Sequence, residues 1–187
     1  PLPKHLAVHG WIIFNGQKMS NSLGNVVDPF LLADRYGADA IRYHILREMA
    51  LGADSSFSNE IMINRINSDL ANGLGNLVSR TVAMVDKYFG GTLPEERQAG
   101  EFDDDLIAAA TGLKAKLETL LDKTQLNQML AEIFQVVSRA NKYIDETAPW
   151  ILARDEANRT RLATVLYNLL ETIRIITLPL GAFMPET

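Results

Sequence analysis

The sequence contains no cysteine, and this absence excludes several kinds of site. Neither a disulfide nor a thiolate metal site can form, and the three histidines, His5, His9 and His44, cannot build a structural zinc cage by themselves. The sequence also lacks an apolar run of about 18 residues, and its N-terminus does not have the layout of a signal peptide. We therefore expect a cytoplasmic protein with no membrane partner and no metal site of its own.

An excess of positive charge is also absent. Lys and Arg total 18 against 23 Asp and Glu, a net charge of −5, whereas nucleic-acid-binding proteins usually carry a basic face. The acidity is local, because residues 95–105 hold six acidic residues against Arg97, a balance of −5. We expect this stretch to be a solvated loop and helix start, since acidic side chains favour the N-terminal end of a helix. The net charge therefore says little about the partner.

Short strands and short helices are predicted for the N-terminal part of the chain. An apolar run is broken by Asn15-Gly16, a strong hairpin signal, and strand character is expected to end there. Asp28-Pro29 predicts the start of a helix that runs to Gly37, and Asp39 is expected to cap a second short helix. Residues 48–58 are interpreted as a polar connection.

From Ile61 onward the pattern is helical, and four amphipathic segments with short links predict an antiparallel helix bundle. The first segment ends near Gly90, and the others are expected at about 104–122, 125–146 and 155–177. Pro149 should close the third helix, and Pro179 should end or kink the fourth. The fold class is thus mostly α, with a hairpin and small helices in residues 1–58 and the bundle in residues 59–187.

Apolar residues of the first long helix fall on one stripe at about 100° per residue. They are Ile63, Ile66, Leu70, Leu74, Leu77, Met84, Val85 and Tyr88. The opposite side carries Asn72, Asn76, Arg80 and Lys87. Amides and guanidinium groups in a row suit base-edge recognition, although an ordinary solvated helix face has the same pattern. Gly73 and Gly75 indicate a close approach by another backbone or a ligand.

Trp150 follows Pro149 at the expected end of the third helix. An aromatic residue at this place either plugs the end of the bundle or provides a stacking platform for an unpaired base, worth about 1–3 kcal/mol per base. The residue pattern does not decide between the two uses. Asn141, Lys142 and Asp145 precede it and belong either to the same site or to solvent.

The run KMSNSLGNVVDP, which begins at Lys18, is by its residues a polar loop whose donors suit phosphate groups. It resembles the KMSKS loop of class I aminoacyl-tRNA synthetases, and HGW at 9–11 is similar to the strand that enters this loop in methionyl-tRNA synthetases. GNLVSR at 75–80, NKYIDETAPW at 141–150 and the closing LPLGAFMPET resemble the anticodon-binding helices of that family. The similarity spans essentially the whole chain, and GNLVSR together with APW points to methionyl-tRNA synthetases among the class I families.

The resemblance implies roles for individual residues. Asn76 and Arg80 match residues that contact the CAU anticodon of tRNA(Met), and Trp150 matches the tryptophan on which the first anticodon base stacks. Asn72 and Pro149 flank these positions.

On the nucleotide side, Lys18, Ser20 and Asn21 match the loop that stabilises pyrophosphate when methionine is activated with ATP and Mg²⁺. His9, Gly10 and Trp11, with Lys18, match the ATP-binding wall. The family has a second lysine where this chain has Asn21. An amide cannot supply the positive charge that offsets developing phosphate charge.

The resemblance also implies a missing catalytic half. The Rossmann half, with its HIGH motif, methionine pocket and zinc-binding insertion, would precede Pro1, so zinc, methionine binding and most of the ATP site lie outside this sequence. We therefore expect a C-terminal piece of a methionine–tRNA ligase that does not aminoacylate alone. Two alternatives need no catalysis: a stand-alone helical module that binds the anticodon stem-loop, and a helical scaffold that binds only proteins.

Overall fold

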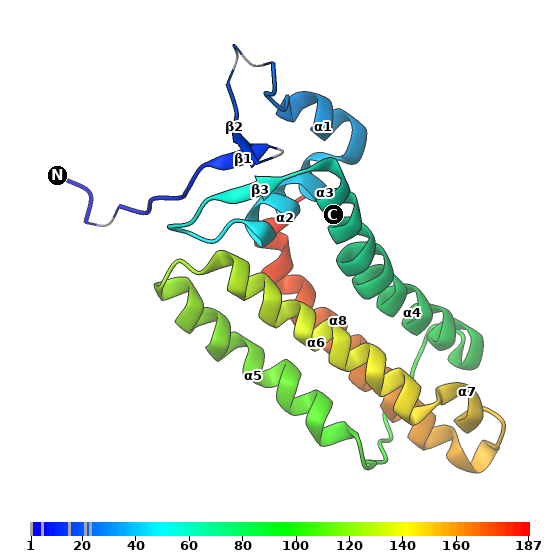
Figure 1. The fold of residues 1–187 in the computed structure, drawn as a ribbon. Coiled ribbons are helices and arrows are strands. Elements are labelled where there is room, and N and C mark those ends of the chain that lie inside the picture. The colour runs from blue at the N-terminus through cyan, green and yellow to red at the C-terminus, as the bar shows by residue number, and fades with distance from the viewer. Residues whose placement is uncertain (1, 5, 15, 21, 23) are drawn as a thin grey trace. The chain divides into compact units, whose positions relative to one another are not determined.

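A computed structural model describes residues 1–187 except for residues 1, 5, 15, 21 and 23 (Figure 1). Its elements, in chain order, are β1 (Ile12–Phe14), β2 (Gln17–Lys18), α1 (Pro29–Tyr36), α2 (Ala38–Glu48), β3 (Ser55–Phe57), α3 (Asn59–Arg65), a π-helix η2 (Ile66–Gly75), α4 (Asn76–Phe89), α5 (Asp103–Asp122), α6 (Leu126–Thr147), α7 (Pro149–Leu152), a 3₁₀ turn η3 (Glu156–Asn158) and α8 (Arg159–Phe183). The predicted fold class, mostly α with a short hairpin near the N-terminus, is confirmed.

The residues cluster into two compact units. The first contains residues 1–68, 115–132 and 180–187, and the second contains residues 69–114 and 133–179. The domain boundary predicted between residues 58 and 59 falls where α3 begins, with Ser58 Oγ accepting a hydrogen bond from Ile61 N at 3.1 Å. That boundary stays a prediction.

The first unit contains a small sheet in the order β2-β1-β3. The predicted hairpin is confirmed: β1 pairs antiparallel with β2, and Gly16 has φ 75° in the turn, while Asn15 lies outside the described residues. Strand character does not end there, however, because β3 pairs parallel to β1 inside the stretch expected to be a polar connection. Phe57 supplies the reason, since its buried ring stacks on that of Phe14, 6.3 Å between centroids. Three residues are too few to produce a visible alternation in sequence.

The two short helices of this unit begin differently. In α1 the prediction is confirmed: Asp28 Oδ1 caps Phe30 N at 2.8 Å, and Gly37 ends the helix with φ 85°. In α2 the predicted cap is wrong, because Gly37 precedes the helix without a side-chain cap. Asp39 is buried and instead accepts hydrogen bonds from Glu186 N and Thr187 Oγ1, both at 2.8 Å. A contact so distant in sequence leaves no local signal.

The predicted first long helix contains a π-helical stretch, η2, between α3 and α4. In a π-helix, hydrogen bonds join residues i and i+5, so each turn contains about one more residue than an α-helical turn. The helix faces before and after a π-helix therefore do not align at 100° per residue. Leu77 and Val85 are buried as the predicted stripe requires, but Met62 is buried in place of Ile63, which is 39% exposed. The stripe prediction is therefore wrong before η2.

The predicted bundle helices are present as α5, α6 and α8. α6 ends at Thr147 as expected, but Pro149 also begins the four-residue helix α7, which the pattern did not indicate. Pro179 does not end α8, because the helix continues to Phe183, and a kink at this proline stays a prediction. Burial of Leu180 and Phe183 offsets the backbone hydrogen bond lost at the proline.

One segment, Glu156–Phe183, is long and apolar enough to cross a membrane by length and composition alone. In the second unit, this helix contributes core residues: Leu162, Ala163, Val165, Leu166, Leu169 and Ile176 are all buried. A core helix passes the same test of length and composition, so the segment is weak support for a membrane span.

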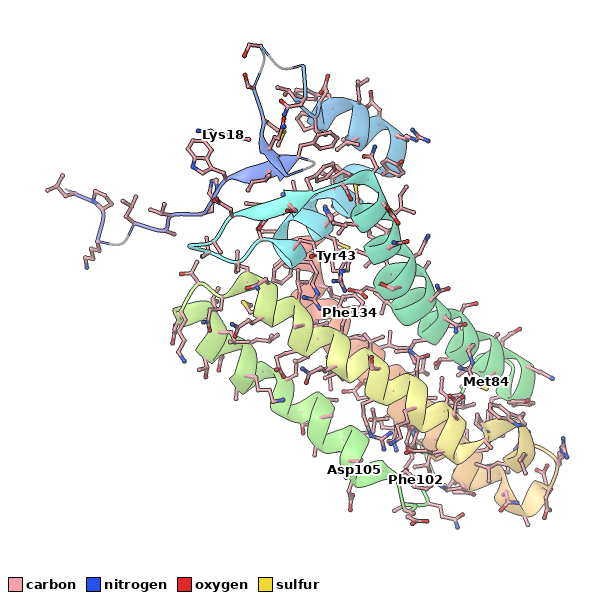
Figure 2. The ribbon with its side chains drawn as sticks, in the orientation of Figure 1. Lys18, Tyr43, Met84, Phe102, Asp105 and Phe134 are labelled. Carbon is pink, nitrogen blue, oxygen red and sulfur yellow. The ribbon has the colours of Figure 1, made fainter. Side chains whose placement is uncertain are left out.

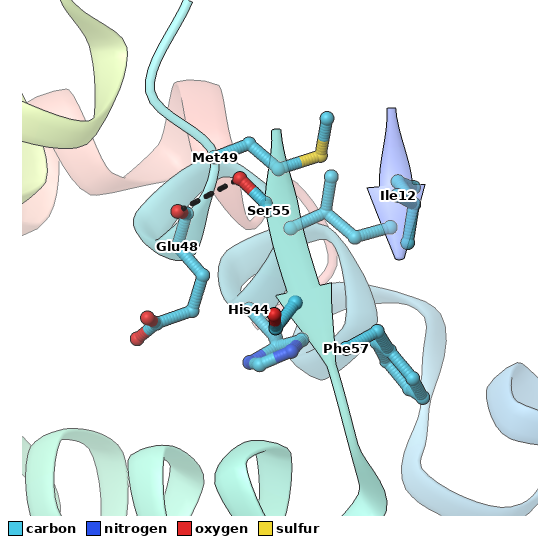
Figure 3. Close-up of a pocket in the computed structure, with 8 residues that line it drawn as sticks. Ile12, His44, Glu48, Met49, Ser55 and Phe57 are labelled. Carbon is cyan, nitrogen blue, oxygen red and sulfur yellow. Dashed lines mark hydrogen bonds between the residues drawn. The ribbon is translucent and has the colours of Figure 1, made fainter. Parts of the chain in front are cut away.

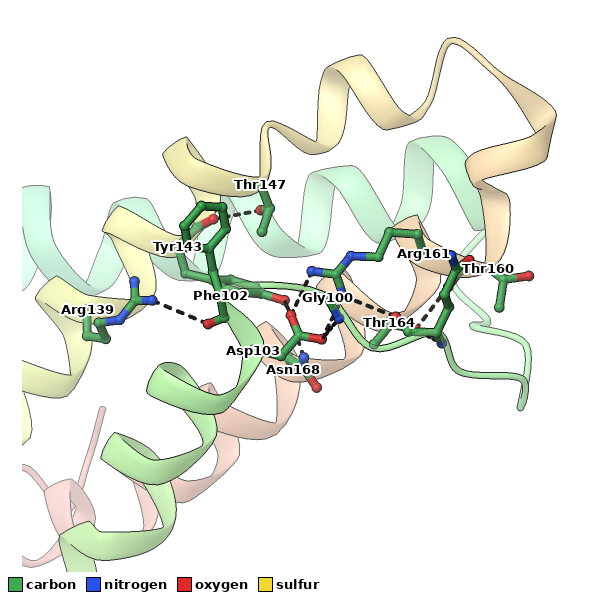
Figure 4. Close-up of polar contacts among 11 residues, drawn as sticks. Gly100, Phe102, Asp103, Arg139, Tyr143, Thr147, Thr160, Arg161, Thr164 and Asn168 are labelled. Carbon is green, nitrogen blue, oxygen red and sulfur yellow. Dashed lines mark hydrogen bonds and ion pairs between the residues drawn. The ribbon is translucent and has the colours of Figure 1, made fainter.

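A buried polar cluster lies in the second unit where α5 begins (Figure 4). Arg161 donates two hydrogen bonds of 2.7 Å to the Asp103 carboxylate, and the Tyr143 hydroxyl donates a third of 2.6 Å. Gly100 N donates to Asp103 Oδ2 at 3.0 Å, and Asn168 Nδ2 donates to the Tyr143 hydroxyl at 3.3 Å. The acidic stretch is thus not wholly solvated as expected, since Asp103 is only 3% exposed.

The cluster changes the acidity of its members. Burial alone would raise the pKa of Asp103, but the hydrogen bonds from Arg161 and Tyr143 outweigh burial and hold the pKa below its ordinary value. Burial, together with the hydrogen bond to Asp103, raises the pKa of Tyr143 to about 12. The ionised carboxylate is therefore the stable form of Asp103 in the folded chain.

Asp103→Asn is expected to lower the free energy of unfolding by about 3–5 kcal/mol at pH 7, because it leaves the Arg161 charge buried without its partner. A lowered folded-state pKa stabilises the fold above the unfolded-state pKa, and this contribution is lost as the pH falls through the folded value. Urea unfolding from pH 7 to 3 measures the effect. The difference between the two proteins should shrink below about pH 4; a constant difference would contradict the assignment.

At the corner between α6 and α7, a residue other than glycine adopts the left-handed backbone conformation. Ala148 has φ 42° and ψ 61°, a conformation that costs an L-residue about 1–2 kcal/mol. Ala148→Gly is therefore expected to raise the free energy of unfolding by about 0.5–1 kcal/mol, after allowance for the greater freedom of glycine in the unfolded chain. The matched control is Ala108→Gly on the exposed side of α5, which should lose about as much. A loss of stability in both variants would contradict the strain at Ala148.

Candidate nucleic-acid interface

Polar side chains from α6 contact η2 and α4 in the second unit. Arg80 Nη2 lies 3.2 Å from Asp145 Oδ1, and Asn141 Nδ2 donates to the Gly73 carbonyl at 3.1 Å. This side-chain hydrogen bond to the Gly73 carbonyl is not the close approach by a backbone or a ligand that the sequence predicted. The Asp145 side chain is 68% exposed, so this ion pair adds at most about 1 kcal/mol to stability. Its effect is to orient the Arg80 guanidinium.

Two free amides lie on the same helical run. Asn72 in η2 and Asn76 at the start of α4 are exposed, and their side chains form hydrogen bonds with none of the described residues. Lys87 is also exposed, and Arg80 is half-buried against Asp145. Gly75 separates the amides, and a Cβ there would lie 3.0 Å from the Leu70 carbonyl oxygen. These residues of one helical run, Asn72, Asn76 and Arg80, which we call the amide strip, carry donors and acceptors suited to base edges.

Trp150 lies in α7, directly after the Ala148 corner. Its side chain is 41% exposed, while Pro149 before it is buried. The indole is therefore neither sealed in the bundle nor fully solvated, and part of its surface is open to a stacking partner. Asp145 lies near the end of α6, just before the corner that leads to Trp150. Its contact with Arg80 therefore connects the start of this corner to the amide strip.

The nucleotide-side residues lie in the first unit. Lys18 is in β2, and its ammonium nitrogen lies 3.6 Å from the centroid of the Trp11 ring (Figure 2). Ser20 and Ser22 hydroxyls are 2.6 Å apart, and Asn21 lies outside the described residues. Asn25, which the sequence did not single out, braces this loop by accepting from Ser20 N at 2.8 Å and donating to the Lys18 carbonyl at 3.3 Å.

Contacts of the backbone hold the segment that contains His9, Gly10 and Trp11 in place. Trp11 N donates to Asp54 Oδ1 at 2.7 Å, and Trp11 O accepts from Ser55 N at 2.9 Å. His9 Nδ1 lies 2.8 Å from the Gly10 carbonyl oxygen. Gly10 is required at its position because a Cβ would collide with the Ala53 carbonyl. Asp54 gave no signal in the sequence, since it lies in the stretch interpreted as a connection.

A small apolar pocket is also present in the first unit, between α2 and the sheet (Figure 3). Its lining includes Ile12, His44 and Phe57, and none of the predicted site residues contribute to it. Burial lowers the pKa of His44, whose ring meets Phe57 edge-on at 5.4 Å. The pocket is therefore not part of either candidate site.

The described residues hold no group of three His, Asp or Glu side chains that could bind a metal ion. The loop donors nevertheless fit a phosphate group, because Lys18 supplies a cation on an exposed side chain and Ser20 supplies a hydroxyl.

Known protein families match both parts of the chain. The family model for class I tRNA synthetases (M) matches residues 1–82, and the model for the anticodon binding domain of methionyl tRNA ligase matches residues 93–187. Methionine–tRNA ligases from Caldanaerobacter subterraneus and Clostridium tetani are 60% and 53% identical to the whole chain. The chain spans about 29% of the length of each of these curated relatives.

Solved structures are similar as well. Mycobacterium tuberculosis methionyl-tRNA synthetase in complex with methionyl-adenylate matches 95% of this chain and 35% of its own length, with a TM-score of 0.90 and 40% identity. The apo form of that enzyme matches the full chain with a TM-score of 0.89 and 36% identity. The chain therefore belongs to the methionyl-tRNA synthetase (methionine–tRNA ligase) family of class I tRNA synthetases.

Proposed function

We propose that this chain recognises the CAU anticodon stem-loop of tRNA(Met) and supplies the ATP-side loop of a cytoplasmic methionine–tRNA ligase. The observation that carries the proposal is the amide strip, where two exposed amides without partners among the described residues lie beside an arginine oriented by Asp145. Family membership supports the same partner. Methionine and ATP with Mg²⁺ would be bound together with a catalytic half such as the relatives contain.

In this proposal, base edges bind to the amide strip. Asn76 and Asn72 each offer a donor and an acceptor, so each amide can read one base edge with two hydrogen bonds. Arg80 offers a planar guanidinium that also stacks on bases. Trp150 provides the stacking surface for the first anticodon base, and Pro149 fixes the direction in which α7 leaves the corner.

The ATP-side loop would act on the leaving group of methionine activation. Negative charge builds up on pyrophosphate as the adenylate forms, and the Lys18 ammonium and the Ser20 hydroxyl would stabilise it. Lys18 rests on Trp11 in the free chain, so it has to leave that ring to reach a phosphate. Asn21 contributes no charge at the position where the family has a second lysine.

Binding is tested by titrating a CAU stem-loop and a stem-loop with a changed anticodon while following Trp150 fluorescence in a Trp11→Phe background. The CAU stem-loop should bind more tightly, with a shallow salt dependence because few cations face the RNA. Asn76→Ala should weaken CAU binding by about 1–3 kcal/mol, about 5–150-fold, because one base edge loses its partner.

Trp150→Ala removes the fluorescent reporter, so its binding is measured by filter retention, and a similar loss is expected for one stacked base. Gln128→Ala, an exposed amide in the first unit, is the matched control and should bind as the unmodified chain does. Equal affinity of the unmodified chain for both stem-loops would refute anticodon recognition and favour a protein-binding scaffold.

The chain by itself should give no ATP–pyrophosphate exchange. Joined to the remainder of the Caldanaerobacter ligase, it should support exchange, and Lys18→Ala should slow the exchange by about 100-fold or more, as expected for removing a charge from the developing pyrophosphate.

Asn21→Lys in the same chimera should raise the exchange rate by about 10-fold, since it restores a cation beside the leaving group. Lys4→Ala, which removes a cation away from the loop, should leave the rate unchanged. A rate that is insensitive to both Lys18 and Asn21 would show that the loop does not stabilise pyrophosphate.

A further inference from the structure

The α6 helix is held on two opposite sides. At about 100° per residue, Asn141 and Asp145 lie about 160° around the helix from Tyr143. Asn141 and Asp145 contact η2 and α4, while the Tyr143 hydroxyl reaches Asp103 at 2.6 Å. The helix is therefore fixed between the amide strip on one side and the buried Asp103 cluster on the other.

The cluster connects directly to the corner that carries Trp150. Thr147 Oγ1, at the last residue of α6, donates to the Tyr143 carbonyl at 2.6 Å (Figure 4). Ala148 N donates to the Ile144 carbonyl at 3.0 Å, and Ile151 N donates to the Ala148 carbonyl at 2.7 Å. The Tyr143 hydroxyl thus anchors the last turn of α6 to the Asp103 carboxylate, and the peptide chain continues from that turn through Ala148 into α7.

The Asp103 cluster is better suited to fixing the positions of its members than to stabilising the fold. An ion pair as buried as Asp103 and Arg161, with side chains 4% and 13% exposed, is often no more stabilising than apolar residues of the same volume. A carboxylate that accepts four hydrogen bonds, however, permits only one arrangement of its donors. An apolar contact would let Tyr143 slide along its neighbours without leaving a polar group unpaired.

We propose that Asp103 and Tyr143 are positioning residues for anticodon discrimination, which they set by fixing α6 and the Trp150 corner relative to the amide strip. Neither residue touches RNA, since Asp103 is 3% exposed and Tyr143 is fully buried. The proposal rests on the proposed anticodon recognition. According to the proposal, a cluster inside the bundle determines how Trp150 and the amide strip are placed relative to each other.

Tyr143→Phe tests the proposal because it removes only the hydroxyl. In the isolated chain, the ¹⁵N–¹H resonance of the Trp150 indole should shift or broaden, and the ratio of affinities for the CAU and changed-anticodon stem-loops should fall about 10-fold. Tyr167→Phe on α8 is the matched control, since Tyr167 is 43% exposed, and it should alter neither quantity. Asn168→Ala removes the other hydrogen bond of the Tyr143 hydroxyl and should act in the same direction, so it replaces Tyr143→Phe if that variant does not fold.

A lower melting temperature in Tyr143→Phe, with an unchanged indole resonance and an unchanged affinity ratio, would overturn the proposal and leave the cluster a stability element. If the chain does not recognise the anticodon at all, the result is different, because the unmodified chain would then bind both stem-loops equally. In that case the indole resonance still decides whether the cluster positions Trp150, and the link to discrimination is refuted.

Discussion

The buried Asp103 carboxylate constrains how several segments of the second unit are arranged. It accepts hydrogen bonds from α8 through Arg161, from α6 through Tyr143, and from the loop before α5 through Gly100. A Cβ at Gly100 would displace the Arg161 guanidinium, whose Cζ would lie too close to it. Three separate segments are therefore joined at one charge, and their relative positions follow from its geometry.

In our proposal, the candidate RNA surface depends on this internal order. Base recognition needs donors and acceptors within a few tenths of an ångström of their ideal places, since hydrogen bonds weaken steeply as angles and distances depart from the optimum. The amide strip lies on a helical run that changes from π to α geometry between Asn72 and Asn76. The contacts from Asn141 and Asp145 hold that run where the helical hydrogen-bond pattern changes.

The negative net charge of the chain does not conflict with the proposed RNA surface. The negative charge of the stretch at 95–105 is partly neutralised within the fold, because Asp103 is paired with Arg161. A net charge of −5 is therefore compatible with RNA binding at a surface of neutral amides. On such a surface, hydrogen bonds to base edges and stacking supply the specificity.

The sequence alone determined the helical periodicity, the hairpin at Gly16, the Asp28 cap and the family, because each of these is written in residues that are close together or in a recognisable motif. Only the tertiary structure decided the partner of Asp39, the strand β3, the π-helix and the burial of Asp103. Each depends on contacts between residues distant in sequence, or on a backbone geometry that the 3.6-residue repeat does not reveal. For the candidate site, the sequence proposed the polar and aromatic residues, and only the fold shows that Asp145 contacts Arg80 and that part of Trp150 stays exposed.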